Sequence, residues 1–285
     1  MIGIQEVHRY SNLRANLRKV QGVITITILG DHAAVSAGQE TMWPAATLSA
    51  GAQEHYIRKS TETNLTIQST SAADSYPSGI GVRTVKLGLI REDGTPYETV
   101  VRMNGLTQVS LDEDGAVFPG IACNYMDPEL VGTNPAIDPS SGDDPSLINT
   151  NQGHLILRHG TDIIGIIEQG TVFPVGITRQ AVFTVPKGFT FLLDDVKGNA
   201  GKDDDITVYI YGVDPINGLY VRQLVVELYQ NFSKALNGSS IPFPEYRLIE
   251  AKCLSSVVGT KTATIELSGR LVINEFLDKV REQRM

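Results

Sequence analysis

Glycines at positions 79 and 81 are the first residues whose spacing suggests chemistry. A dinucleotide-binding loop needs a third glycine at position 84, followed by a helix whose N-terminus faces the pyrophosphate. Position 84 is Thr84, and the residues after Arg83 alternate between apolar and polar types. This two-residue period is typical of a half-buried strand. We therefore expect Gly79 and Gly81 to bend the chain into a strand, because glycine adopts positive φ without steric cost, and we expect Asp74 to pair with Arg83 across the bend.

Two groups of aspartates suggest calcium, a hard cation that prefers carboxylate oxygens. One group is Asp138, Asp143 and Asp144, and the other is the run of aspartates at 203–205. Neither group matches the calcium loop of twelve residues with glycine at its sixth position and glutamate at its twelfth. Aspartate is also favoured in turns, where its side chain hydrogen-bonds the backbone. We interpret both groups as turn aspartates and expect no metal site, with calcium binding as the alternative.

Histidine and cysteine form no catalytic or metal-binding pattern in the sequence. Cys123 and Cys253 have no further cysteine or histidine at ligand spacing, so we expect two buried thiols without a disulfide or zinc. His154 and His159 are five residues apart, and residues at this spacing on a strand point to opposite faces. The chain also lacks the G-x-S-x-G and H-E-x-x-H motifs. We therefore predict no enzyme activity and no cofactor. The histidines are His8, His32, His55, His154 and His159.

Charge and hydropathy exclude two classes of partner. The chain has 285 residues, with 24 Lys and Arg against 32 Asp and Glu, which gives a net charge of −8. A nucleic-acid-binding protein usually carries a basic face instead. The sequence has no apolar run of about 18 residues, and its first residues lack the apolar core of a signal peptide. We expect a soluble protein of a reducing compartment that binds neither nucleic acid nor membrane.

A short basic segment near the N-terminus is the local exception to this acidic balance. Arg9, Arg14, Arg18 and Lys19 lie within it, and positions 14 and 18 share one face if the segment is helical. Such a segment suits an acidic partner, and a solvated helix face is the alternative. We take these four residues as candidate partner-binding residues, together with Trp43, the only tryptophan.

The first sixty residues differ in pattern from the rest of the chain. Residues 4–20 have weak helical periodicity, and residues 22–29 then alternate strictly, as in a strand. From there to residue 60 the sequence is rich in Ala, Gly and Thr, with few large apolar residues. We predict that residues 1–60 form an extended arm with a short helix and a strand but little core of their own. The alternative is a ragged first sheet packed on the main domain.

Residues 61–285 read as a single all-β domain. Strand patterns recur every eight to twelve residues, and Asp-Gly at 93–94 and Asn-Gly at 104–105 supply turns between them. Short strands without long amphipathic helices favour an antiparallel β-sandwich, of jelly-roll type, over a barrel. The stretch 127–153 contains four prolines and is expected to form a long surface loop. Residues 274–285 are expected to form a short closing helix.

Three stretches together resemble a module of structural proteins from tailed bacteriophages. Residues 69–109 contain a Ser-rich lead, an Asp, the pattern G-x-G-x-R-T-V, an E-x-V strand and N-G-x-T. Residues 151–193 contain N-x-G and a V-P-x-G turn, and residues 241–273 are similar to the closing strands of the module. The resemblance covers about residues 60–275. It implies a virion structural protein with no catalytic motif, made in the cytoplasm of a bacterial host.

The resemblance, the arm and the long loop lead to one functional hypothesis and two rivals. The leading hypothesis is a capsid decoration or cement protein that forms a homo-oligomer and contacts the major capsid protein or tail proteins. The first rival is a tail, baseplate or fibre component. The second is a carbohydrate-binding or depolymerising β-sandwich, against which the low aromatic content of 7% argues.

Overall fold

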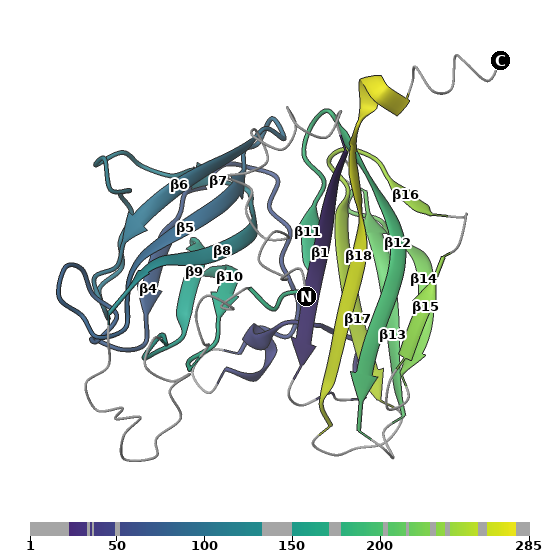
Figure 1. Cartoon of the computed structure of the whole chain (residues 1–285), viewed down its shortest axis with the longest axis horizontal. Coiled ribbons are helices and arrows are strands. Elements are labelled where there is room, and N and C mark those ends of the chain that lie inside the picture. The colour runs from purple at the N-terminus through teal and green to yellow at the C-terminus, as the bar shows by residue number, and fades with distance from the viewer. Residues whose placement is uncertain are drawn as a thin grey trace, which may run out of the picture. The chain divides into compact units, whose positions relative to one another are not determined.

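The chain is built from antiparallel β-sheets (Figure 1). The computed structural model describes residues 23–277, apart from gaps at 33–34, 36, 49–51, 133–149, 171–177, 202–204, 215–216, 229–231, 237–239 and 256–260. Every ladder within the described ranges is antiparallel. A helix begins at residue 274, directly after the last strand. The predicted antiparallel all-β class with a short C-terminal helix is confirmed.

The chain divides into two compact units, which differ from the predicted arm and single domain. Unit 1 comprises the described parts of Met1–Tyr56, Asp93–Thr95 and Arg179–Met285, and unit 2 those of Ile57–Glu92 and Pro96–Thr178. Unit 2 is therefore inserted in the sequence between two strands of unit 1. None of the described helices is long and apolar enough to cross a membrane.

Unit 1 contains two five-stranded sheets, which we call sheet A and sheet B (Figure 1). Sheet A has the order β1 (Val23–His32), β18 (Ala263–Ile273), β12 (Phe189–Ala200) and β15 (Phe232–Ala235), with β16 (Ile241–Phe243) also paired to β12. Sheet B has the order β11 (Val182–Thr184), β17 (Leu248–Ser255), β13 (Ile206–Val213) and β14 (Tyr220–Leu228), with β2 (Glu40–Thr41) also paired to β17. A short 3₁₀ turn, η2 (Pro44–Thr47), follows β2.

The strands of unit 1 pair in a nested order. The first long strand, β1, pairs along its whole length with the last, β18, and these lie side by side as purple and yellow arrows in Figure 1. After the two-residue strand β2, β11 pairs with the next to last strand, β17, to which β2 is also paired. Farther in, β12 pairs with β15 and β16, and β13 pairs with β14. The chain of unit 1 is thus a long hairpin folded over into two sheets.

Sheets A and B bury their facing side chains in one hydrophobic cluster. Alternate residues of each strand point into it, as the two-residue period of a strand requires. Sheet A contributes Ile26, Ile28, Phe191, Leu193, Val196, Ile265, Leu267 and Leu271. Sheet B contributes Val208, Ile210, Val226, Leu228, Ile249, Ala251 and Cys253.

The prediction that residues 1–60 have little core is wrong for the residues of this range that the structure describes. Ile26 and Ile28 of β1 belong to the hydrophobic cluster, as does Met42 after β2. The reason is periodicity: the isoleucines of "VITITIL" stand at every second position, so a strand with few large residues still buries one full face. This part of the chain does not form a separate first sheet either, because β1 pairs with β18 in sheet A and β2 with β17 in sheet B.

Unit 2 contains three smaller sheets. One has the order β6 (Pro96–Arg102), β5 (Val82–Ile90) and β8 (Ala122–Val131), and another β10 (Asp162–Ile167), β9 (Leu155–His159) and β4 (Thr66–Ser69). The third pairs β3 (Thr63–Asn64) with β7 (Pro119–Gly120). The predicted surface loop 127–153 begins later than expected, because β8 continues to Val131. Residues 133–149 of that loop lie outside the described residues.

Substituting an isoleucine of β1 tests whether this region belongs to the core. We expect Ile28→Ala to lower the free energy of unfolding by about 2–5 kcal/mol, because it opens a cavity in the cluster. The control, Thr27→Ala, changes the opposite face of the same strand and should cost about 0.5 kcal/mol or less. Urea denaturation followed by circular dichroism measures both. An Ile28→Ala variant as stable as the control would instead support the prediction that this region has little core.

Candidate functional site

The residues predicted to bind a partner are not brought together at a described surface. Arg9, Arg14, Arg18 and Lys19 lie outside the described residues. Trp43 is fully buried, so it cannot offer its ring to a partner, and its prediction as a partner-binding residue is corrected.

The contacts of Trp43 give it a structural role. Its indole Nε1 donates a hydrogen bond to the Gln53 carbonyl oxygen at 3.0 Å. Its ring meets Tyr56 edge-on, with centroids 5.5 Å apart. A tryptophan whose N–H finds an internal acceptor can bury its whole apolar surface. The side chain therefore stabilises unit 1.

A buried carboxylate, Asp74, joins three segments of unit 2. Its Oδ1 accepts hydrogen bonds from the backbone N–H groups of Val82 at 2.7 Å and Gln152 at 2.9 Å. Its Oδ2 accepts from the Gly153 N–H at 2.8 Å and the Ser69 hydroxyl at 2.6 Å. An ionised carboxylate has about four acceptor positions, so these four donors saturate it. We call this arrangement the Asp74 junction.

The Asp74 junction explains the glycines at 79 and 81 differently from the sequence prediction. Neither glycine has positive φ. A Cβ on Gly81 would lie 2.0 Å from Asp74 Oδ1, and one on Gly79 would lie 2.3 Å from the Ala73 carbonyl oxygen. Both positions require glycine because other atoms approach too closely for a side chain.

The expected pair between Asp74 and Arg83 is also wrong. The Arg83 Nε donates to the Gly79 carbonyl oxygen at 2.8 Å instead. The acceptor positions of both Asp74 carboxylate oxygens are already occupied by three backbone N–H groups and the Ser69 hydroxyl. The segment is a structural junction and not a phosphate-binding loop.

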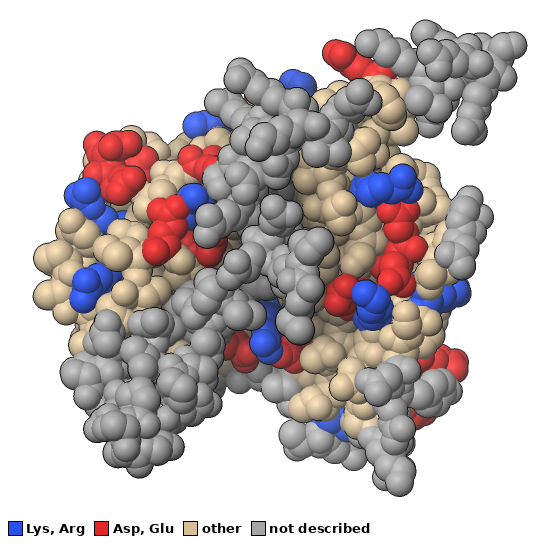
Figure 2. All heavy atoms as spheres, in the orientation of Figure 1, with Lys and Arg blue, Asp and Glu red and all other residues tan. Residues whose placement is uncertain are grey.

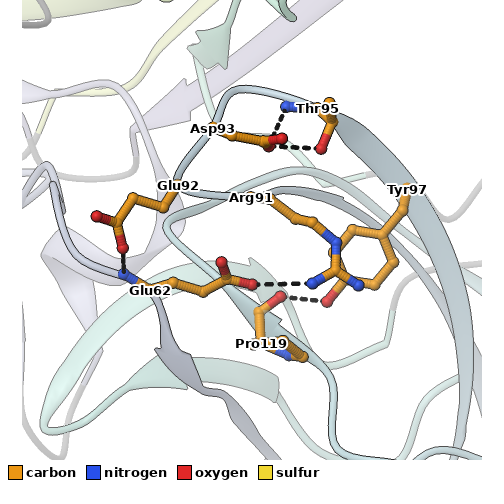
Figure 3. A network of polar contacts seen from close by, with 7 residues as sticks. All are labelled: Glu62, Arg91, Glu92, Asp93, Thr95, Tyr97 and Pro119. Atoms are coloured by element: carbon orange, nitrogen blue, oxygen red, sulfur yellow. Dashed lines mark hydrogen bonds and ion pairs between the residues drawn. The ribbon is translucent and has the colours of Figure 1, made fainter.

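A second polar network in unit 2 lies beside the β5–β6 hairpin (Figure 3). Arg91 Nη1 lies 3.1 Å from Glu62 Oε1, and the guanidinium lies 4.3 Å from the centre of the Tyr97 ring. The Tyr97 hydroxyl donates to the Pro119 carbonyl oxygen. Burial raises the pKa of Tyr97, so this hydroxyl stays protonated. The groups pair with one another, as in a structural brace rather than a reactive site.

The predicted Asp-Gly turn at the tip of this hairpin is present. The Asp93 carboxylate accepts a hydrogen bond from the Thr95 N–H at 2.9 Å and another from its hydroxyl, as drawn in Figure 3. Gly94 has φ of +78°, which glycine adopts without strain. Asp93 stays at negative φ, so only the glycine of the pair uses the left-handed region.

The outward face of sheet B carries the strongest candidate for a binding surface. Ile206, Val208 and Ile210 of β13 point into the cluster, so Tyr209 and Tyr211 lie on the opposite face. The rings of Tyr209 and Tyr211 stack with centroids 6.2 Å apart.

The tyrosine pair continues onto the neighbouring strands. Tyr211 meets Tyr220 of β14 edge-on at 5.5 Å, and Lys252 Nζ of β17 lies 4.3 Å from the centre of the Tyr220 ring. The Tyr211 hydroxyl donates to Gln39 Oε1 at 3.2 Å. We call Tyr209, Tyr211, Tyr220 and Lys252 the tyrosine face. Aromatic rings beside hydrogen-bonding groups suit contact with another molecule.

A buried carboxyl group, Glu250, lies next to the tyrosine face. Thr41 Oγ1 donates to Glu250 Oε1 at 2.5 Å, and Lys252 Nζ lies 3.7 Å from the same oxygen. Thr41 Oγ1 also accepts from the Tyr56 N–H at 2.8 Å. Burial raises the pKa of Glu250, against the opposing effects of the Lys252 charge and the Thr41 hydrogen bond. The carboxyl group thus binds β17 to β2 at the cost of desolvating its charge.

His32 and the two cysteines are buried and have structural surroundings. His32 Nε2 lies 2.7 Å from Glu40 Oε2, and burial lowers the pKa of His32 despite that neighbour. Cys123 and Cys253 are buried free thiols, as predicted. Burial raises the pKa of Cys123 to about 12 and also raises that of Cys253, so neither thiol is activated for nucleophilic attack.

Acidic side chains form no metal site in the part of the chain that the structure describes. No three His, Cys, Asp or Glu residues in those ranges are grouped closely enough to hold a metal ion. The aspartates at 138, 143, 144, 203 and 204 lie outside the described residues.

Sheets A and B differ in the kind of side chain that they expose to solvent. The outward face of sheet A carries ion pairs along β12 and β18, seen as adjacent red and blue spheres in Figure 2. Arg270 holds Asp194 through two nitrogens at 2.7 and 2.9 Å, and Lys197 pairs with Glu266 at 3.1 Å. Paired charges of this kind suit contact with solvent.

Strand β14 of sheet B instead exposes apolar side chains. Three of them belong to the strand and one directly precedes it: Leu219 is 62% exposed, Tyr220 45%, Val221 47% and Val225 41%. Strand β14 therefore exposes more apolar surface to solvent than the ion-paired face of sheet A does.

Comparisons with known proteins give only distant structural similarity. No protein-family profile matches the chain, and no curated protein matches its sequence. The solved structures similar to it include the VP2 subviral particle of infectious bursal disease virus, with 8% identity over 88% of this chain and 72% of that chain and a TM-score of 0.19. The Gx strain of the same virus gives 9% identity, 88% and 73% coverage and a TM-score of 0.20. At such TM-scores the similarity supports no argument about fold or function.

Sequence reasoning missed the tyrosine face, although a signal for it was present. In "ITVYIYGV" the two tyrosines stand two residues apart between cluster residues, which places both on one outward face. Tyr220 and Lys252 could not be added, because they join through strand pairings that the sequence does not reveal.

Replacing Asp74 by asparagine tests the Asp74 junction. An amide offers one oxygen and a donating NH₂ group, so two buried donors would lose their acceptor. We expect Asp74→Asn to lower the free energy of unfolding by about 3 kcal/mol or more. The matched control is Asp114→Asn in an exposed turn, with an expected change within about 0.5 kcal/mol. Denaturation followed by circular dichroism gives both values, and equal stability of the two variants would contradict a structural role for Asp74.

Replacing Glu250 by glutamine tests its raised pKa. The folded protein holds the Glu250 proton more tightly than the unfolded chain, so the wild type loses stability as pH rises above the ordinary value of 4.5 towards the raised one. Glutamine does not titrate. The melting temperature of Glu250→Gln relative to the wild type should therefore increase from pH 4 to pH 8. A difference that is constant or falls over this range would show that the pKa is not raised.

Proposed function

We propose that the chain is a structural component of a virus particle. The observation that carries the proposal is the nested pairing of unit 1, from β1 with β18 inward to β13 with β14. A long hairpin folded into two four-stranded layers is the topology of a jelly roll, to which β2 and β16 add short strands. Jelly rolls are the recurrent architecture of viral capsid domains, and they also occur in lectins and cupins.

The resemblance to tailed-phage structural proteins adds support from unit 2. Its pattern residues Ser69, Asp74, Gly81 and Gly153 come from two separate stretches of the resemblance and meet at the Asp74 junction. A pattern explained by hydrogen bonding and close packing fits a structural module without a catalytic residue.

Within this role, capsid decoration remains our first proposal and a tail, baseplate or fibre position the second. The described residues of 23–56 contribute to the hydrophobic cluster, so they do not form a coreless arm that could order against a neighbouring chain. Decoration now depends on the resemblance and on the basic residues at 9, 14, 18 and 19 as contacts to an acidic neighbour.

Purified particles test this proposal. Quantitative mass spectrometry of gradient-purified virions should detect the protein at a fixed copy number. A number matching the capsid lattice positions would support decoration, and a number matching the symmetry of a tail would support the second position. Virions of the encoding virus that lack the protein would overturn the virion role.

The tyrosine face favours a second candidate function, carbohydrate binding. Sugars stack their C–H faces on aromatic rings, and the jelly roll is also a lectin architecture. Glycan-array binding by the wild type that is lost in Tyr211→Ala would support this function. The control is Tyr246→Ala, which changes a tyrosine outside the tyrosine face.

A further inference from the structure

Strand β14 ends sheet B and presents a backbone edge. In the described residues it pairs with β13 alone, so its second edge faces away from the sheet. Natural proteins cover such edges or blunt them with charge, because an open edge recruits another strand. Its exposed side chains are mixed: the apolar ones are Leu219, Tyr220, Val221 and Val225, and the charged ones are Arg222 and Glu227.

A register shift in β14 brings two opposite charges onto one face. Arg222 lies opposite Tyr211, Val225 opposite Tyr209, and Glu227 opposite Thr207. Residues five apart on a regular strand point to opposite faces, but the shift between Ile210 and Tyr211 adds one residue to β14. All three side chains are exposed on the outward side of the sheet.

The three residues are symmetric about Val225. Their partners on β13 are Tyr211, Tyr209 and Thr207, so Arg222 and Glu227 lie equally far from Val225 in opposite directions. If a second β14 pairs antiparallel about a two-fold axis at Val225, each Arg222 faces the partner's Glu227. Opposite charges directly across an antiparallel pair are stabilising.

We propose that β14 is the contact edge of a symmetric dimer, in which a second copy of this chain extends sheet B. Val225 meets its own counterpart on the axis, and two Arg222–Glu227 pairs flank it. A two-fold axis requires such a self-complementary surface. The partner is a second copy because the charges of β14 complement themselves.

The end strand of sheet A on the side of β12, β15, lacks this property. Strand β15 carries Lys234 and no acidic residue, so two copies of β15 would bring like charges together. The dimer also places both tyrosine faces on the same side of one continuous sheet, because a two-fold axis perpendicular to a sheet preserves its faces. The inference goes beyond the proposed virion role and holds for the isolated protein.

Charge reversal on the full chain tests the interface. Size-exclusion chromatography with light scattering should find the wild type as a dimer. Arg222→Glu replaces two attractive pairs by two repulsive ones and should weaken dimerisation about 30-fold. Adding Glu227→Arg restores the pairs in reversed order and should restore the dimer. Lys234→Glu makes an equal change of charge on β15 and should have no effect.

Three results would overturn the proposal. One is a wild type that stays monomeric at all concentrations, and another is an Arg222→Glu variant that dimerises as the wild type does. The third is a double variant no better than the single one, since altered folding alone would not be rescued by the second substitution. A monomeric protein that is nevertheless present in virions would overturn this interface and leave the virion role standing.

A disulfide at the axis tests the register directly. Residues directly opposite in antiparallel strands have Cα atoms about 4.5–5.5 Å apart, within the range that a disulfide spans. Val225→Cys should therefore cross-link two chains under mild oxidation. Val221→Cys is a control of similar exposure on the same strand, and residue 221 does not face its own counterpart in this register. Cross-linking of Val221→Cys alone, or of neither variant, would contradict the two-fold axis at Val225.

Discussion

The hydrophobic cluster shared by sheets A and B is the interaction on which unit 1 depends. Each sheet buries one face in it, and the strands that supply it come from both ends of the chain. Burial of this kind is the main favourable contribution to folding, at about 25 cal/mol per Å² of apolar surface. The outward side chains of the two sheets differ in kind. Sheet A uses its outward face for ion pairs, whereas sheet B carries tyrosines and an apolar edge.

Unit 2 depends on a different interaction, in which the buried Asp74 carboxylate accepts hydrogen bonds at all of its acceptor positions. Asp74 lies 78 and 79 residues before two of its donors, Gln152 and Gly153, and so ties distant segments together. Removing a buried carboxylate from water is costly, and full hydrogen bonding offsets this cost. The glycines around it are explained by the same requirement, because a side chain at Gly81 would displace the carboxylate oxygen. The residues of the phage-like pattern are thus those that assemble the Asp74 junction.

The sequence pattern predicted the features that depend on neighbouring residues, which are strands and tight turns. The alternation at 22–29 and after Arg83 predicted β1 and β5, and the Asp-Gly pair at 93–94 predicted the turn between β5 and β6. Long-range pairing determines the rest. The burial of Trp43, the division into two units and the bulge in β14 all depend on segments that are distant in sequence. The tyrosine face lies between these cases. Tyr209 and Tyr211 follow from the alternation of one strand, whereas Tyr220 and Lys252 join them through strand pairing.

The proposed functions of this chain reside in surfaces that join molecules and not in a reactive centre. Hydrogen–deuterium exchange of β14 in the full chain tests this most directly, because strand pairing protects backbone amides from exchange. Amides of Tyr220–Leu228 should exchange more slowly at high protein concentration than at low concentration, while those of β15 should not change. Exchange of β14 that is independent of protein concentration, in a range where the protein should pass from monomer to dimer, would contradict the proposal.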